Sequence, residues 1–353
     1  MDDPKRLYGA RKYSEILTEG LEYIHDRRIG KIKSIKTPWL GFNQVTTNGL
    51  EWGSMLTIGA RPGSGKTLIV SQLIREVHKN NPDQDFNVLE FQFEMGAKQS
   101  AARAFAAETA LDYNLVLSTD KTLDDFGFKM MMQYRDECKA MEDVGIQRLQ
   151  INQPINHHDI EKAIHHYYHQ LGSKPLIVSI DHSWLIKKAP DEKEKIATLY
   201  NTVEMLMRVK NQLPIIVLMI TQLNRSIEES GRKTPGTIAN YPTSSDIFGG
   251  DALMQGSDVV IVLSRPAKND IFVYGPKGYI VKDDDIFVHL LKVRNGSDDV
   301  KMLFMKGEFN RQRMIEVSEP QGSNTQFVRR SQRTSGGASA SNTGFGDIDI
   351  DDI

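Results

Sequence analysis

The chain has 353 residues, of which 25% are charged and 39% hydrophobic, and its formal net charge at pH 7 is −2. This is the composition of an ordinary globular protein with one large domain or two small ones. A charge so close to zero excludes a surface that is basic throughout, so nucleic-acid binding would need basic residues gathered in one place. No stretch approaches the roughly 20 apolar residues of a membrane span, the N-terminus does not resemble a signal peptide, and the single cysteine, Cys138, excludes an internal disulfide. We therefore expect a cytoplasmic protein with no membrane contact.

The first predicted element is an amphipathic helix over residues 11–29. Its apolar residues recur at helical spacing, and Gly30 is a plausible stop. The stripe consists of Tyr13, Ile16, Leu17, Leu21 and Ile24. We expect residues 1–36 to form a linker, and the sequence leaves open whether its helix packs on its own domain or docks on a neighbouring subunit.

A glycine-rich turn follows the apolar run 55–58 and precedes a helix-like segment, which is the setting of a phosphate-binding loop. The turn consists of Ala60, Arg61, Pro62, Gly63, Ser64, Gly65, Lys66 and Thr67. Glycines let backbone N–H groups point at a phosphate, and the N-terminus of the following helix adds partial positive charge. Lys66 would reach the β- and γ-phosphates of ATP, and the Thr67 hydroxyl would hold Mg²⁺. Ala60 stands where this pattern usually has glycine.

Short apolar runs alternate with helix-like segments through residues 37–317. The runs are 54–59, 87–93, 147–151, 175–181, 214–221, 257–264, 286–293 and 300–305. Two of them, 175–181 and 214–221, are apolar on both faces, as central strands of a parallel sheet are. We therefore predict an α/β fold for residues 37–317, with a doubly wound, mainly parallel sheet and flanking helices.

Three polar side chains stand at the ends of these predicted strands, where α/β sheets bind their ligands. Glu94 follows the second strand and could orient and deprotonate a water molecule. Asp181 has the position of a carboxylate that holds Mg²⁺ directly or through water. Gln222 could sense the γ-phosphate. Together with the phosphate-binding loop, they predict nucleoside triphosphate hydrolysis.

Residues 318–353 are predicted to be a flexible linker, rich in Ser, Gly, Thr and Asn, with an acidic end. Aspartate and isoleucine alternate in 344–353 after one aromatic residue. This end resembles the acidic tail of single-stranded-DNA-binding proteins, and we expect it either to dock on a replication protein or only to keep the chain soluble.

Six motifs in order resemble those of DnaB-type replicative helicases, a family of RecA-like hexameric ATPases. They are residues 60–67, 93–95, 179–181, 221–225, 245–258 and 292–296. The resemblance covers roughly residues 37–315. It implies a RecA-like fold and a homo-hexameric ring that hydrolyses ATP with Mg²⁺ while it translocates 5′→3′ on single-stranded DNA during replication.

The resemblance also implies roles for particular residues. Glu94 would be the catalytic base, Asp181 the metal-associated carboxylate and Gln222 the sensor. Lys292 and Arg294 would reach the γ-phosphate held by the next subunit, because an arginine supplied in trans stabilises charge in the transition state. Phe309 would pack near the nucleotide base.

The sequence departs from the family in two places. Only about 35 residues precede the predicted ATPase core, so we expect the family's N-terminal helical domain to be missing, as in a phage or mobile-element protein. Without that domain, a loader or recombination mediator that hydrolyses ATP without unwinding DNA is the alternative function. A third reading is an assembly factor that uses ATP only to set its oligomeric state.

The second departure lies in the long segment 226–250, where RecA-like rings turn loops toward DNA. The family tends to place an arginine or a similar residue soon after its Ser-Asp pair. Here the pair is Ser245-Asp246, and no such residue follows it. We expect DNA to be bound by Arg225, Arg232, Lys233, Phe248 and Gly249, with phosphate contacts from the cations and stacking on Phe248 and Tyr241. The alternative is a disordered surface insert. Five histidines between 157 and 169 are expected to lie on a solvated helix face rather than to bind a metal.

Overall fold

The computed structural model describes residues 10–120, 123–296 and 299–320. The predicted acidic segment 344–353, and all of the linker beyond residue 320, lie outside the described residues. Within the described chain, no helix combines the length and the apolar character needed to cross a bilayer.

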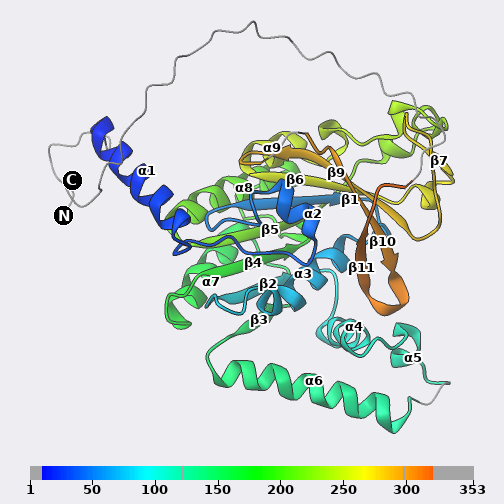
Figure 1. Ribbon diagram of the computed structural model, residues 1–353, viewed down its shortest axis with the longest axis horizontal. Coiled ribbons are helices and arrows are strands. Elements are labelled where there is room, and N and C mark those ends of the chain that lie inside the picture. Colours follow the sequence, from blue (N-terminus) through cyan, green and yellow to red (C-terminus); the bar gives the residue numbers. More distant parts are fainter. Residues whose placement is uncertain (1–9, 121–122, 297–298, 321–353) are drawn as a thin grey trace, which may run out of the picture.

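A nine-stranded sheet with the order β11-β10-β9-β6-β1-β5-β4-β2-β3 forms the centre of the molecule (Figure 1). The strands are β1 (Met55–Ala60), β2 (Asn87–Gln92), β3 (Arg148–Ile151), β4 (Leu176–Asp181), β5 (Ile215–Gln222), β6 (Val259–Ser264), β9 (Asp285–Val293), β10 (Met302–Glu308) and β11 (Arg313–Val317). The six strands from β6 to β3 pair in parallel, and β9, β10 and β11 are joined to them by antiparallel pairings. The predicted α/β, mainly parallel sheet is therefore confirmed.

Helices lie on both faces of the sheet, and the described chain has nine. They are α1 (Tyr13–Arg28), α2 (Leu40–Val45), α3 (Lys66–Asn80), α4 (Ala97–Thr109), α5 (Tyr113–Leu117), α6 (Asp125–Asp143), α7 (His157–Gln170), α8 (Lys195–Gln212) and α9 (Gly250–Gly256). One apolar core joins α2 and α3 to the sheet, and a second joins α7, α8 and α9 to it. This arrangement on two faces is that of a doubly wound domain.

Each predicted apolar run coincides with a strand, and the ends differ by at most three residues. The central strands β4 and β5 are buried along almost their whole length, which explains why they could be read from apolar residues alone. The edge strand β11 and the two-residue strands β7 (Val273–Tyr274) and β8 (Tyr279–Ile280) were not predicted. Their half-exposed sequences lack a continuous apolar run.

Helix α1 projects from the body of the domain (Figure 1) and contains no buried residue. Its base is held to the domain by an ion pair of 2.6 Å between Arg27 and Glu51. The apolar stripe of the predicted helix is exposed, with Tyr13, Leu21 and Ile24 each more than half accessible. Within the described chain, α1 therefore does not use this stripe to pack on its own domain.

The segment 226–250 is folded rather than extended. Its two ends are joined because Leu223 bridges Ile247 and the Asn224 N–H donates to the Asp246 carbonyl at 2.7 Å. Between them lie four short 3₁₀ turns, η3 (Arg225–Glu228), η4 (Ser230–Lys233), η5 (Ile238–Asn240) and η6 (Ser244–Asp246). A compact loop with closed ends is typical of functional surface loops.

Candidate nucleotide-binding and catalytic site

The phosphate-binding loop has the backbone that its glycines predict. It connects the end of β1 at Ala60 to the start of α3 at Lys66, with φ of 78° at Gly63 and 91° at Gly65. Such values are open to glycine and costly for other residues. A Cβ at Gly65 would also lie 2.2 Å from the methyl group of Met314. A glycine-rich turn of this kind directly before the N-terminus of a helix is suited to bind a phosphate through backbone N–H groups.

The register of the sheet brings the predicted catalytic residues to this same edge. Ala60 at the end of β1 is level with Gln222 at the end of β5, and Gln92 in β2 is level with Asp181 at the end of β4. Glu94 follows β2 by two residues. Parallel strands place these side chains beside the phosphate-binding loop, which is the crevice expected for a ligand.

Asp181 is buried beside the start of α3. Burial raises its pKa to about 6, the Glu94 charge adds to the rise, and the Thr67 hydroxyl and Lys66 ammonium oppose it. Neither carboxylate oxygen has a partner with hydrogen-bond geometry among the described residues. Buried oxygens without partners are costly, and an oxygen-binding cation is one group that would satisfy them. The Asp181 carboxylate and the Thr67 hydroxyl therefore fit Mg²⁺.

A polar chain joins the predicted base to the predicted sensor. The His182 Nε2 atom lies 3.7 Å from a Glu94 carboxylate oxygen and 3.2 Å from the Gln222 amide nitrogen. Burial lowers the pKa of His182 to about 4, although the Glu94 charge opposes this, so the ring is neutral at pH 7. The sequence reasoning missed His182, and its position directly after Asp181 is the signal that could have identified it.

Phe309 lies against the phosphate-binding loop, with a ring carbon 3.6 Å from the place of a Cβ on Gly65. The Arg265 guanidinium covers this ring at 3.8 Å from its centroid and donates to the Gly63 carbonyl at 3.3 Å. Arg265 was also missed, although it directly follows β6 at the same edge of the sheet. The two side chains form a cation–π pair beside the loop.

Arg61 turns away from the phosphate-binding loop toward the segment that follows β5. Its guanidinium donates to the Leu223 carbonyl at 2.9 Å and pairs with Glu228 at 2.6 Å. The phosphate-binding loop and the first turn of segment 226–250 are therefore in direct polar contact.

Lys292 and Arg294 lie at the opposite end of the sheet from this site. Lys292 is level with Val260, the Arg294 N–H donates to the Asp258 carbonyl, and the Asp258 N–H donates to the carbonyl of Met55, where β1 begins. Since β1 rises about 3.3 Å per residue, its start and its end at Ala60 are roughly 17 Å apart. The structure does not bring this pair to the phosphate-binding loop of its own chain.

Arg294 is held in place at that end. It pairs with Asp258 at 2.8 Å and keeps about half of its side chain exposed. Asp258 also pairs with the buried Lys210 at 2.5 Å and accepts from the Met55 N–H at 2.9 Å. The guanidinium is thus oriented by a carboxylate that is itself fixed.

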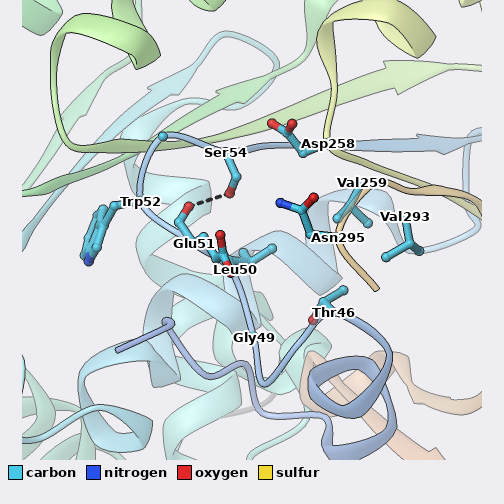
Figure 2. Close-up of a pocket in the computed structure, with 11 residues that line it drawn as sticks. Thr46, Gly49, Leu50, Glu51, Trp52, Ser54, Asp258, Val259, Val293 and Asn295 are labelled. Atoms are coloured by element: carbon cyan, nitrogen blue, oxygen red, sulfur yellow. Dashed lines mark hydrogen bonds between the residues drawn. The ribbon is translucent and has the colours of Figure 1, made fainter. Parts of the chain in front are cut away.

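A pocket of about 90 Å³ opens beside Asp258 and Asn295 (Figure 2). The described residues that line it include the carboxylates Glu51 and Asp258 and no lysine or arginine. Its electrostatics therefore disfavour a phosphate, in contrast to the glycine-rich loop with Lys66 at the other end of the sheet.

Some of the residues predicted to bind DNA are accessible to solvent, and others pack within the domain. Arg225 is exposed and Lys233 half-buried. Gly249 has a φ of 65°, and a Cβ there would lie 2.1 Å from Leu199, so its role is close packing on α8. The ring of Tyr241 packs on Tyr274 and His289, with centroids 5.2 and 4.8 Å apart.

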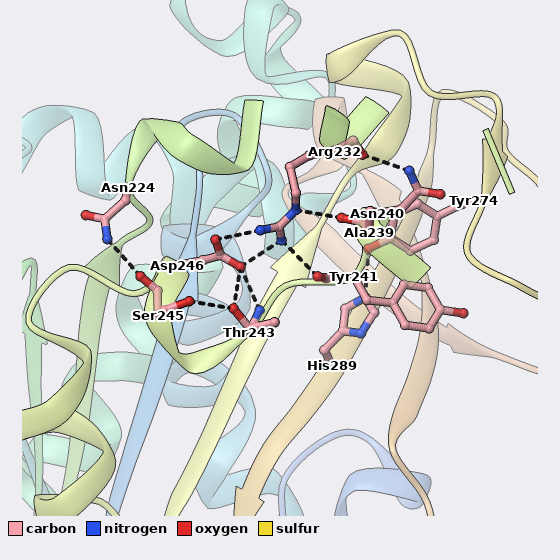
Figure 3. A network of polar contacts seen from close by, with 10 residues as sticks. All are labelled: Asn224, Arg232, Ala239, Asn240, Tyr241, Thr243, Ser245, Asp246, Tyr274 and His289. Carbon is pink, nitrogen blue, oxygen red and sulfur yellow. Dashed lines mark hydrogen bonds and ion pairs between the residues drawn. The ribbon is translucent and has the colours of Figure 1, made fainter. Parts of the chain in front are cut away.

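Arg232 belongs to the internal structure of the loop (Figure 3). Its guanidinium pairs with Asp246 at 2.8 and 3.0 Å, and donates to the carbonyls of Ala239 and Tyr241 at 2.6 and 2.9 Å. Asp246 in turn accepts from the Thr243 N–H at 2.7 Å. Contact with DNA phosphate stays a prediction for Arg232, but its charge is already matched by a buried carboxylate.

The histidines do not all lie on a solvated face as expected. His158, His166 and His169 are exposed, but His157 is buried, with its Nδ1 atom 3.3 Å from a Glu192 oxygen. Burial lowers the pKa of His157.

Comparison with known proteins agrees with this geometry. Replicative DNA helicase DnaB of Helicobacter pylori (strain ATCC 700392 / 26695) is 26% identical over 315 residues, which are 85% of this chain and 56% of the relative. Replicative DNA helicase DnaC of Bacillus subtilis (strain 168) is 24% identical over 250 residues, or 70% of this chain and 50% of the relative. The chain thus spans about half the length of the curated relatives it matches.

Solved structures show the same fold. One that contains an ATPase domain alone superposes with a TM-score of 0.70 at 17% identity, covering 88% of this chain and all of that one. The structure of a DnaB-like replicative helicase, described together with its interactions with primase, superposes with a TM-score of 0.69 at 17% identity. The match covers 88% of this chain and 68% of that one. The predicted RecA-like fold is confirmed. Residues 34–313 match the model of the DnaB-like helicase C-terminal domain, and the chain belongs to that family.

Proposed function

We propose that this chain is the motor of an ATP-driven DNA helicase, which translocates 5′→3′ on single-stranded DNA as a ring of six copies. The observation that carries the proposal is the separation of the phosphate-binding loop from Lys292 and Arg294 on opposite ends of one sheet. Cations that cannot reach their own nucleotide can complete the site of the next copy in a head-to-tail assembly.

The chain's own site supplies the steps of hydrolysis. The loop amides and Lys66 bind the phosphates of ATP, and Glu94 orients the attacking water and takes its proton. His182 lies between Glu94 and Gln222, so a movement of the sensor that displaces this ring also changes the surroundings of the base. Held by Thr67 and Asp181, Mg²⁺ would neutralise charge on the β- and γ-phosphates.

Arg294 and Lys292 act on the ATP of the neighbouring copy. In the described chain Asp258 presents the Arg294 guanidinium toward solvent. A cation delivered there stabilises the charge that spreads over the γ-phosphate oxygens as the bond breaks. Hydrolysis in one copy therefore depends on the position of the next.

The exposed stripe of α1 supports this assembly. An amphipathic helix that buries no apolar residue on its own domain has a surface suited to another protein, and a second copy of the chain is the occupant we propose. DNA is bound by segment 226–250 through Arg225 and Lys233, and the acidic segment 344–353 docks on a replication protein.

Unwinding of a forked duplex, measured together with imaging of the particles, tests the proposal. We expect ATP-dependent strand separation that requires a 5′ single-stranded arm, and closed six-membered rings with an ATP analogue and single-stranded DNA. DNA-stimulated hydrolysis without strand separation or rings would instead identify a loader or recombination mediator.

A further inference from the structure

Trp184 is an exposed residue in an otherwise largely buried segment that directly follows β4, the strand that ends at Asp181. It lies in the 3₁₀ turn η2 (Ser183–Leu185), and Asp181, His182, Ser183 and Ile186 around it are buried. Trp184 nevertheless keeps 45% of its surface accessible. A single exposed apolar residue is ordinary, so the surroundings of the ring decide its meaning.

The indole ring packs edge to face on Phe248, with centroids 4.7 Å apart and planes at 85°. The Lys195 ammonium lies 5.9 Å from the indole centroid, and Lys187 is exposed nearby in the chain. Two aromatic rings beside an ammonium group are a combination with which proteins bind single-stranded nucleic acid without sequence preference.

The backbone that carries both rings is tied to the strands beside the predicted ATP site. The Ser183 hydroxyl donates to the Thr221 hydroxyl at 3.1 Å, which ties η2 to β5. The Phe248 N–H donates to the Gln222 carbonyl at 3.1 Å, and the following Gly249 packs closely on α8. A ring held this way loses little conformational freedom when a ligand stacks on it.

We propose that Trp184 and Phe248 form a stacking platform for a base of single-stranded DNA. The inference rests on the proposed function, since that function supplies the strand, and it adds a residue outside segment 226–250 to the DNA-binding surface. The base stacks on the exposed part of the indole, and Phe248 supports the indole from the side. Lys187 and Lys195 attract the adjoining phosphates. The base then lies next to the strand ends that carry Asp181 and Gln222.

Intrinsic fluorescence gives a direct test, because the chain has three tryptophans in different surroundings. Trp39 is buried, and Trp52 lines the pocket at the opposite end of the sheet. Oligothymidylate of about 16 nucleotides is expected to quench the tryptophan fluorescence of the wild type and of the matched control Trp52→Phe in a saturable way. Trp184→Phe should lose this quenching.

Affinity measurements separate stacking from charge. Trp184→Ala should weaken binding of the oligothymidylate by roughly 5- to 150-fold, which corresponds to about 1–3 kcal/mol for one stacked base. Binding of an abasic strand of the same length should change by less than about twofold, because that strand keeps its phosphates and has no base to stack. Trp184→Phe should restore most of the affinity.

Three outcomes overturn the platform. They are quenching that persists in Trp184→Phe, equal losses on the two strands, and unchanged affinity for oligothymidylate in Trp184→Ala. If the wild type binds neither strand, the proposed helicase function fails as well. If the wild type binds both strands but the variant matches it, only the platform fails.

Discussion

Asp181 ends β4 and Glu94 follows the neighbouring strand β2, yet their surroundings differ sharply. The Asp181 carboxylate is fully buried, whereas 44% of the Glu94 side chain is exposed at the edge of the crevice. A buried carboxylate without partners suits a bound cation, and an accessible one suits a water molecule that must come and go. Position on the sheet thus suits two residues of similar chemistry to the different tasks that we propose for them.

Lys66→Ala and Glu94→Gln should therefore fail in different ways. Lys66→Ala removes a charge that binds the phosphates, so both ATP affinity and hydrolysis should be lost. Glu94→Gln should bind ATP as the wild type does and turn it over at least ~100-fold more slowly, as expected when a general base is removed. Nucleotide titrations with steady-state hydrolysis distinguish them, with Glu229→Gln on the exposed loop as the control. An equal loss of affinity in both variants would rule out the role of Glu94 as base.

His289 predicts a pH dependence of stability. It is buried against the Tyr274 hydroxyl at 2.8 Å, and burial lowers its pKa to about 3. The unfolded chain binds a proton near pH 6.5 and the folded chain does not. This contribution to stability is complete above about pH 6.5 and declines as the pH falls toward 3.

Chemical denaturation between pH 7 and pH 5 should show a falling free energy of unfolding. One such histidine contributes at most about 1.4 kcal/mol per pH unit. His289→Gln keeps an acceptor for Tyr274 and should flatten the slope by up to that amount. His166→Gln, an exposed histidine, is the matched control and should leave the slope unchanged. A wild-type slope retained in His289→Gln would mean that the ring is not held neutral.

At the scale of elements, the phosphate-binding loop and the central strands could be predicted because their sequences carry strong local signals. Glycine at left-handed positions and continuous apolar runs leave few alternatives. Segment 226–250 gave no such signal, because polar contacts order it. Arg232 pairs with Asp246, and Asn240 accepts from the Gly275 N–H at 3.0 Å. Contacts between residues so distant in sequence cannot be read from local pattern. His182 and Arg265 differ, because each directly follows the end of a strand, and this local signal was available in the sequence.

Arg232 and Lys233 should therefore contribute to DNA binding by different routes. Arg232→Ala leaves the Asp246 carboxylate buried and unpaired, which costs about 3–5 kcal/mol, so the loop should open to proteolysis and DNA affinity should fall with it. Lys233→Ala should leave the loop intact and reduce the slope of log affinity against log salt by roughly 0.7, or one phosphate contact on a single strand.

Limited proteolysis and salt titrations of oligothymidylate binding provide the two measurements. Asp246→Asn removes the other half of the ion pair and should resemble Arg232→Ala in protease sensitivity. If the loop of Arg232→Ala stays resistant to protease and the slope of log affinity against log salt becomes smaller, Arg232 contacts DNA phosphate directly, as predicted from the sequence.

At the scale of the whole molecule, the proposed assembly needs two copies of the chain for each ATP site. One copy supplies Lys66 and Glu94, and another supplies Arg294 from the opposite end of its sheet. Arg294→Ala should still bind ATP and hydrolyse it at least ~10³-fold more slowly, as loss of an arginine finger does. Arg294→Ala mixed with Glu94→Gln should regain activity, because some junctions then combine an intact base with an intact finger.

The hydrolysis rate at a series of mixing ratios measures this rescue. Arg294→Ala mixed with Lys66→Ala should behave in the same way, and either variant alone should remain inactive. Absence of rescue at every ratio, with mixed assemblies present, would show that each chain hydrolyses ATP alone.

In the proposed assembly, the placement of Arg294 far from its own phosphate-binding loop also determines how the hydrolysis rate depends on the number of copies. In an open row of n copies, Arg294 of the copy at one end has no neighbouring nucleotide to contact. The copy at the other end holds a nucleotide that no arginine reaches. Only n − 1 of the n sites can then turn over, so the rate per copy rises with row length and approaches a limit. Closure removes both ends at once. The rate per copy should therefore climb with protein concentration and become constant once rings have formed.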